Sequence, residues 1–353
     1  MAQTIEGKAG VSAPVPSRRK RRRRYNRGAY LYLFPTFFIL ALFIYYPIIE
    51  SFRLSLNRVA PFGGKELFVG VENYTRLLQS ADFWNTVKVS LWFMVGTVPI
   101  GIGLAVAIAI LLSVPLKRLS GVYRTLIFVP VVISSAIAGV LFRLLYNPVV
   151  GFFNHWLSLV GIDGPNWLQE QTWALVSVTA TIVWRQLGFN VIIALAGIQQ
   201  IDDNLYEAAK VDGAGVFKRI WHITLPMLTP TLFFLAIVNV IISLQSFGEI
   251  NILTDGGPGR ATTNLVYQLF VDGFVGTHFV GRASAPAFML AIMIIAISFI
   301  QFRGLGKRVH YQGALQTPPQ PWMCSTRPRA PSQRAASADL ARSQSTSRCL
   351  SSG

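Results

Sequence analysis

The sequence predicts an all-α membrane protein, a polytopic bundle of six transmembrane helices. Two observations lead to this fold class. Hydrophobic residues make up 52% of the 353 residues and charged residues only 13%, about half of the ~25% typical of soluble domains. Six segments are also long and apolar enough to cross a bilayer. A soluble globular protein does not fit this composition, and a disordered chain would contain far fewer apolar residues.

Each segment meets the length that a bilayer requires. A helix rises 1.5 Å per residue, so about 20 mostly apolar residues cross roughly 30 Å of hydrocarbon. The predicted spans are residues 29–50, 87–112, 122–146, 172–196, 226–250 and 286–305. The first span follows a basic run, as the apolar core of a signal peptide does. Its apolar stretch is too long and no small-residue cleavage site follows it, so we expect it to be retained.

The distribution of Lys and Arg predicts the orientation of the spans. The run Arg18–Arg24 directly precedes the first span, and such clusters favour the cytoplasmic side. The loops 113–121 and 197–225 carry two and three Lys or Arg residues, whereas residues 147–171 contain none. We therefore expect both termini in the cytoplasm of a multi-pass inner-membrane protein. The position of the basic run favours contact with anionic membrane lipid over RNA or DNA, so no nucleic-acid partner is expected.

Composition divides the chain into three regions. We expect a basic cytoplasmic tail over 1–27, a membrane domain over 28–312 and a disordered cytoplasmic tail over 313–353. The last region is rich in Ser, Arg, Pro, Gln and Ala and cannot bury enough apolar surface to fold. The abrupt change after Gln312 leaves an altered reading frame open. Both cysteines lie in this tail, so the membrane domain offers no disulfide or catalytic thiol.

The loop between the fourth and fifth spans has strong local signals. Residues 204–226 read NLYEAAKVDGAGVFKRIWHITLP. Asn204 followed by Glu207 predicts a capped helix start, because Asn accepts from early backbone N–H groups and Glu reaches back. Gly213 and Gly215 are expected to end this first helix, and Pro226 to open the next span. The result is a short helix–turn–helix element at the cytoplasmic face.

This loop resembles the EAA loop of ABC-importer permeases. The shared pattern is Glu-Ala-Ala, three residues, Gly, nine residues and Ile-x-Leu-Pro. The matching residues are Glu207, Ala208, Ala209, Gly213, Ile223, Leu225 and Pro226, with Asp212 and Ala214 filling out the longer form. In that family the loop is the coupling helix that docks into a groove on the cytoplasmic ATPase. The resemblance implies that Glu207 makes a polar contact there, that the alanines allow close approach and that Gly213 forms the bend.

Softer signals over residues 28–312 resemble the carbohydrate-uptake group of these permeases, in particular the maltose-type large subunit. They include GVENY at 70–74, DFW at 82–84, LTDGGPGRATT at 253–263 and QFRGLGKRVHY at 301–311. The resemblance implies half of the pathway for a sugar or oligosaccharide. The implied partners are a second homologous permease, a cytoplasmic ATPase dimer and an extracytoplasmic solute-binding protein. Glycerol-3-phosphate or a polyol is the alternative solute.

No catalytic or metal site is expected in the chain. It lacks a Walker motif, so ATP and Mg would be bound by the partner ATPase and no cofactor by this chain. The four histidines are scattered without metal-ligand spacing. An ion-coupled secondary transporter is a more distant alternative, because it would need ionisable relays and internal repeats that the spans lack. A membrane-anchored nucleic-acid or signalling protein is the other.

Polar residues inside the predicted spans are candidates for the solute path. Such groups are costly in lipid and usually face a bundle interior or a water-filled path. The candidates are Asn190 in span 4 and Asn239, Ser243, Gln245 and Glu249 in span 5. Contact between helices is the competing interpretation of Asn190, Asn239 and Ser243. Arg185 and Glu249 are expected to have a structural or gating role.

Overall fold

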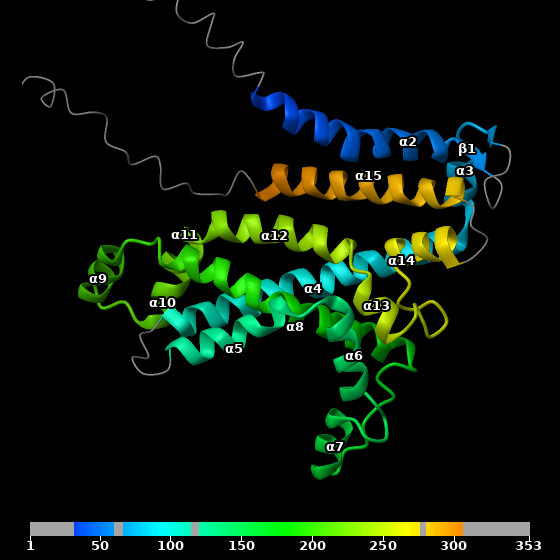
Figure 1. The fold of residues 1–353 in the computed structure, drawn as a ribbon. Helices are drawn as coiled ribbons and strands as arrows, with labels where there is room; N and C mark the ends of the chain where they lie inside the picture. Colours follow the sequence, from blue (N-terminus) through cyan, green and yellow to red (C-terminus); the bar gives the residue numbers. More distant parts are fainter. Residues whose placement is uncertain (1–31, 60–65, 114–119, 276–279, 306–353) are drawn as a thin grey trace, which may run out of the picture. The chain divides into compact units, whose positions relative to one another are not determined.

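The computed structural model describes residues 32–59, 66–113, 120–275 and 280–305 (Figure 1). This part of the chain is almost entirely helical, with one two-stranded hairpin. The predicted tails 1–27 and 313–353 lie outside the described residues. The elements in chain order are η2 (Ala41–Tyr45), α2 (Tyr46–Ser55), β1 (Asn57–Val59), β2 (Glu66–Phe68), α3 (Glu72–Gln79), α4 (Ala81–Ser113), α5 (Ser120–Val132), α6 (Ser135–Leu145), α7 (Phe152–Leu159), α8 (Gln171–Ile198), α9 (Asp203–Val211), α10 (Val216–Arg219), η3 (Ile220–Thr224), α11 (Leu225–Met227), α12 (Thr229–Leu244), α13 (Gly248–Leu253), α14 (Leu265–Phe270), η4 (Val271–Val275) and α15 (Val280–Leu305).

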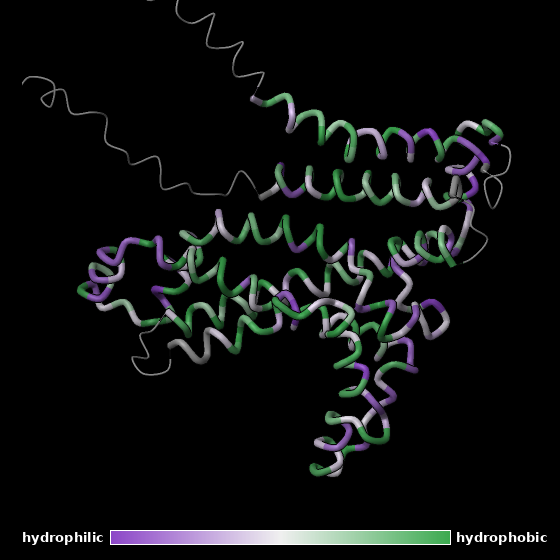
Figure 2. The backbone as a smooth tube through the Cα atoms, viewed as in Figure 1, coloured by the Kyte–Doolittle hydropathy of each residue, from purple (hydrophilic) through white to green (hydrophobic). Residues whose placement is uncertain are grey.

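Several helices are long and apolar enough to cross a membrane. Four of them qualify alone, and these are Tyr32–Ser55, Ala81–Ser113, Gln171–Ile198 and Ala283–Gly304. Two bent pairs raise the number to six if each pair is counted as one span. Figure 2 shows hydrophobic residues along these helices and hydrophilic residues gathered around α9. The predicted all-α membrane helix bundle is confirmed at this level.

The predicted third span, 122–146, is not one continuous helix. The chain breaks at Ile133 and Ser134, and the two helical pieces meet at 109°. Ser134 begins α6 as its N-cap, with its hydroxyl accepting a hydrogen bond from the backbone N–H of Ile137 at 3.3 Å. This side chain replaces a backbone partner that a continuous helix would have supplied. The apolar pattern that predicted a single span does not reveal such a cap.

The predicted fifth span, 226–250, is also interrupted. Helix α12 ends at Leu244, and a separate short helix, α13, begins at Gly248. A Cβ placed on Gly248 would lie 2.2 Å from the hydroxyl oxygen of Ser135, so the starts of α13 and α6 approach too closely for any other residue. The two helix breaks therefore meet in space, although they are more than a hundred residues apart in the sequence.

Helix α8 lies at the centre of the bundle. It packs against α4 along its length and also contacts α5 and α12. Phe93 and Ile182 are completely buried in one of the apolar clusters between these helices. Hydroxyl groups inside the bundle bond to carbonyls of their own helix, as Thr181 does to Ser177 at 2.9 Å. These bonds satisfy polar groups without breaking the apolar packing.

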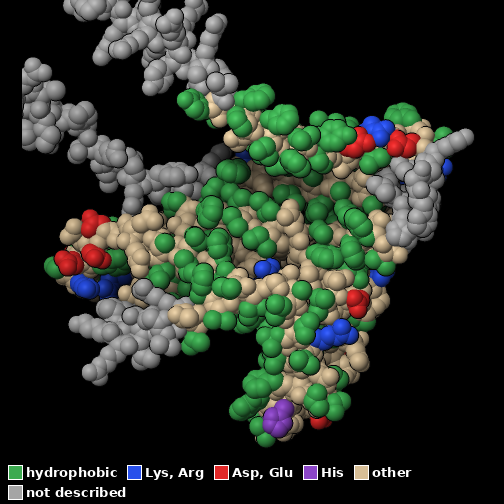
Figure 3. Space-filling view, viewed as in Figure 1, with side chains coloured by type: hydrophobic (Ala, Val, Ile, Leu, Met, Phe, Trp, Pro, Cys, Tyr) green, Lys and Arg blue, Asp and Glu red, His purple; other side chains and the backbone are tan. Residues whose placement is uncertain are grey.

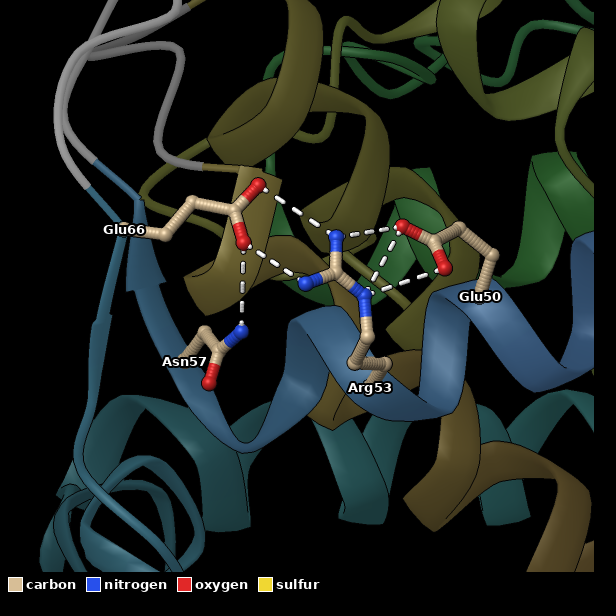
Figure 4. A network of polar contacts seen from close by, with 4 residues as sticks. All are labelled: Glu50, Arg53, Asn57 and Glu66. Atoms are coloured by element: carbon tan, nitrogen blue, oxygen red, sulfur yellow. Dashed lines mark hydrogen bonds and ion pairs between the residues drawn. The ribbon is translucent and has the colours of Figure 1, made fainter.

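A charged network lies at the end of the bundle opposite α9 (Figures 1 and 4). Strands β1 and β2 form an antiparallel hairpin that follows α2. The guanidinium of Arg53 donates to Glu50 at 2.6 Å and to Glu66 at 2.8 Å, so it ties the hairpin to the helix end. Asn57 donates to the same Glu66 carboxylate at 3.4 Å. All three charged side chains are exposed, so solvent screens each pair and its contribution to stability is small.

Candidate functional site

The loop between α8 and α12 begins with a capped helix, α9. Its N-cap is Asp202, whose carboxylate accepts from the backbone N–H of Asn204 at 2.9 Å. The predicted cap at Asn204 is therefore wrong by two residues, because Asn204 already lies within the helix. Asp accepts a hydrogen bond at this position as well as Asn does. Asp and Asn residues follow one another here, so the sequence pattern alone could not show which of them is the N-cap.

Gly213 ends α9 in the left-handed conformation, with φ +74°. Its N–H donates to the carbonyl of Lys210 at 3.0 Å, and the N–H of Ala214 donates to the carbonyl of Ala209 at 2.9 Å. This pair of bonds is the Schellman motif, which satisfies the last carbonyls of a helix. Gly215 was also predicted to end α9. It has φ −65° and is instead the residue from which α10 starts.

The chain then returns to the bundle through α10, η3 and α11. Pro226 lies in the three-residue α11, which continues the helical run from Val216. The long helix α12 begins at Thr229, so the prediction that Pro226 opens the next span is wrong by three residues. A bend of 65° separates Val216–Met227 from α12. Ile223 and Leu225 pack against a buried apolar cluster that includes Ile198 and Leu228. The end of the motif therefore anchors the loop to the membrane helices.

The first half of the motif faces outward. Glu207, Ala208, Asp212 and Gly213 are exposed, and Ala209 and Ala214 are half-buried. Figure 3 shows acidic and basic side chains gathered at this end of the molecule. The apolar side chains of Val211 and Phe217 are 88% and 80% exposed, respectively. The motif did not single out these two residues.

A second group of polar residues lies between α8 and α12. The side-chain amides of Asn190 and Asn239 bond to each other in both directions, at 3.0 Å and 2.8 Å, and both residues are buried. Gln186 lies one turn before Asn190, and Ser243 one turn after Asn239. Gln186 Nε2 and Ser243 Oγ are buried without a hydrogen-bond partner among the described residues. We call these four residues the polar seam.

Two predicted path residues do not belong to the polar seam. Gln245 is exposed and caps the end of α12. Glu249 belongs to α13, is 1% exposed and forms an ion pair with Arg185 of α8. A continuous fifth span would have placed the four candidates after Asn190 on one helix, and the break at 245–247 separates them. Within the described part of the chain, no three His, Cys, Asp or Glu side chains gather as metal ligands would.

Comparison with known proteins identifies the family of this chain. The family described as "Binding-protein-dependent transport system inner membrane component" matches residues 97–304. The sn-glycerol-3-phosphate transport system permease protein UgpA of Agrobacterium fabrum is 35% identical over 283 residues, covering 80% of this chain and 96% of that protein. The UgpA protein of Brucella abortus is 36% identical over 284 residues, with the same two coverages.

A solved structure shares the fold. A chain of a bacterial ABC transporter involved in the import of the acidic polysaccharide alginate superposes with a TM-score of 0.72 at 24% identity. The match covers 82% of this chain and 99% of that chain. Together with the family match and the relatives at 35–36% identity, the apolar helices establish what the chain is. It is a multi-pass inner-membrane permease of an ABC importer and belongs to the family of binding-protein-dependent transport system inner membrane components.

Proposed function

We propose that the chain forms one half of the translocation pathway, with six spans and both termini in the cytoplasm. Each bent helix pair then contains one span of the membrane domain 28–312, flanked by the cytoplasmic tails 1–27 and 313–353. A second, homologous permease supplies the other half. Six spans with both termini on one side agree with the Lys and Arg residues of the loops 113–121 and 197–225 and with the absence of Lys and Arg from 147–171.

The α9 loop is the proposed coupling helix. The observation that carries this proposal is the division of the loop into an exposed half, with Glu207 and Ala208, and an anchored half, with Ile223 and Leu225. Such an element can bind an external subunit and transmit its movement to α12. The partner is a cytoplasmic ATPase dimer that binds and hydrolyses ATP with Mg. This chain then catalyses no reaction and binds no cofactor.

The proposed solute is a sugar or oligosaccharide delivered by an extracytoplasmic binding protein. Supporting evidence is the uncharged polar seam, because amide and hydroxyl groups are suited to hydroxyl-rich solutes. Gln186 and Ser243 have unused hydrogen-bonding atoms there. The related alginate transporter has been solved with a solute-bound periplasmic protein, which is consistent with such a delivery partner.

Glycerol-3-phosphate is the second candidate solute, because several relatives at 35–36% identity carry that name. A phosphate group would favour an unpaired cation in the path. Arg185 is the cation nearest in sequence to the polar seam, and Glu249 pairs with it. This pairing favours the uncharged solute.

Solute-dependent ATPase activity of the reconstituted complex tests the proposal. The complex would be placed in liposomes with its binding protein and offered a panel of sugars, polyols and glycerol-3-phosphate. One sugar is expected to stimulate both ATP hydrolysis and uptake. Stimulation by glycerol-3-phosphate alone would establish the second candidate. Uptake that follows an ion gradient and needs no ATP would refute the importer.

A further inference from the structure

Helix α9 has few connections to the membrane helices. None of its residues is fully buried. Its Asp202 cap and its Schellman end use atoms of the loop itself. A coupling helix must nevertheless move together with the membrane helices, because a helix that swings freely about its two flanking turns transmits little force. The contact that joins α9 to the bundle is therefore of functional interest.

Tyr206 makes that contact. Its hydroxyl lies 3.0 Å from the hydroxyl of Thr224 in η3, and the two share a hydrogen bond. Among the described residues, no other side-chain hydrogen bond joins α9 to a residue beyond the α9–α10 turn. The Tyr206 side chain also packs against the buried cluster that includes Ile198, Ile201 and Leu228. One side chain thus joins α9 both to η3 and to this cluster.

Thr224 is well placed to receive this contact. It is 4% exposed and directly precedes α11, at the end of the π-helical turn η3. Its neighbours Ile223 and Leu225 pack against the same cluster as Tyr206. The 65° bend into α12 follows a few residues later. A displacement of α9 therefore reaches the base of α12 through Tyr206 and Thr224 without passing through the exposed α10.

We propose that Tyr206 is a positioning residue for transport, and that its hydrogen bond to Thr224 makes α9, η3 and α11 move as one unit. The inference rests on the proposed role of α9 as the coupling helix and adds the contact that carries its movement. It assigns a function to two residues outside the Glu-Ala-Ala-Gly pattern. Loss of either hydroxyl should leave ATP hydrolysis intact and reduce the solute transported per ATP hydrolysed.

The test compares Tyr206→Phe, Thr224→Val and the double variant in the reconstituted complex with its ATPase and binding protein. Each single change is expected to lower the ratio of solute transported to ATP hydrolysed by roughly threefold to tenfold, the factor that one neutral hydrogen bond represents. The double variant should be no worse than either single one, because both remove the same bond. Thr224→Ser keeps the hydroxyl, so its ratio of solute transported to ATP hydrolysed should equal that of the unmodified complex.

A matched control separates coupling from stability. Tyr146→Phe also removes a hydrogen-bonded tyrosine hydroxyl, which donates to the carbonyl of Ser177 at 3.1 Å, but Tyr146 lies outside the loop. Its ratio should equal that of the unmodified complex. If Tyr206→Phe and Thr224→Val leave the ratio unchanged while Glu207→Gln lowers it, the positioning role is wrong and the coupling helix stands. If Glu207→Gln also leaves the ratio unchanged, the coupling role of the loop itself fails.

Discussion

Asn190 of α8 and Asn239 of α12 exchange two amide hydrogen bonds across the centre of the bundle, at 3.0 Å and 2.8 Å. Asn239 also donates to the carbonyl of Leu235 in its own helix at 2.8 Å. Removing one amide leaves the other buried without this hydrogen-bond partner, whereas replacing both with apolar side chains leaves an apolar contact. This asymmetry allows packing and solute binding to be tested separately.

Asn239→Leu alone should destabilise the permease by about 1–3 kcal/mol, the cost of a buried unsatisfied amide. The double variant Asn190→Leu/Asn239→Leu should lose less than the sum of the two single changes. Thermal unfolding of the purified complex measures both effects. If the polar seam lines the path, the double variant should still transport poorly, with a raised KM. A double variant with normal stability and normal KM would show that the Asn pair only packs α8 against α12 and does not contact the solute.

Gly213→Ala should disturb the α9 loop, and Gly215→Ala should not. Both positions have open space where a Cβ would be, so sterics do not distinguish them. They differ in φ, which is +74° at Gly213 and −65° at Gly215. An alanine held in the left-handed region costs about 1–2 kcal/mol. Uptake by the two variants at equal expression is the measurement, and equal loss in both would argue against the Schellman turn as the sensitive feature.

The sequence predicted the membrane class and the α9 loop because both depend on local patterns. Apolar length marks a span whatever its neighbours, and Gly213 is required by the backbone of its own turn. The breaks near Ser134 and Gly248 depend instead on each other, since the close contact of Gly248 with Ser135 joins two distant segments. A single sequence carries no sign of that contact.

The polar seam could be predicted only in part. A spacing of four residues places Asn239 and Ser243 on one face of α12, and Gln186 and Asn190 on one face of α8. The spacing does not reveal that the two faces meet. The ion pair of Arg185 with Glu249 joins α8 to α13, a separate helix that begins after the break at the end of α12. The spacing of polar residues within the spans therefore could not predict that Glu249 pairs with Arg185.

Glu207→Gln should uncouple ATP hydrolysis from transport with little effect on folding. The side chain is exposed, and surface changes of this kind usually alter stability by less than about 0.5 kcal/mol. Asp203→Asn, in the first turn of the same helix, is the matched control for loss of one exposed negative charge. Copurification of the ATPase and uptake in liposomes are the two measurements. Equal uptake by both variants would mean that Glu207 has no special contact.

The ion pair between Arg185 and Glu249 supports a last prediction, about stability. Glu249 is almost fully buried, and the side chain of Arg185 is 23% exposed. Glu249→Gln leaves a largely buried guanidinium without its counter-charge, and breaking a buried pair costs about 3–5 kcal/mol. The double variant Arg185→Met/Glu249→Met removes both charges and should recover much of that loss. Thermal unfolding of the three proteins in one detergent decides the matter. A double variant as unstable as Glu249→Gln would show that α13 is held against α8 by shape rather than by the charge pair, and a fully stable but inactive one would assign the pair to transport.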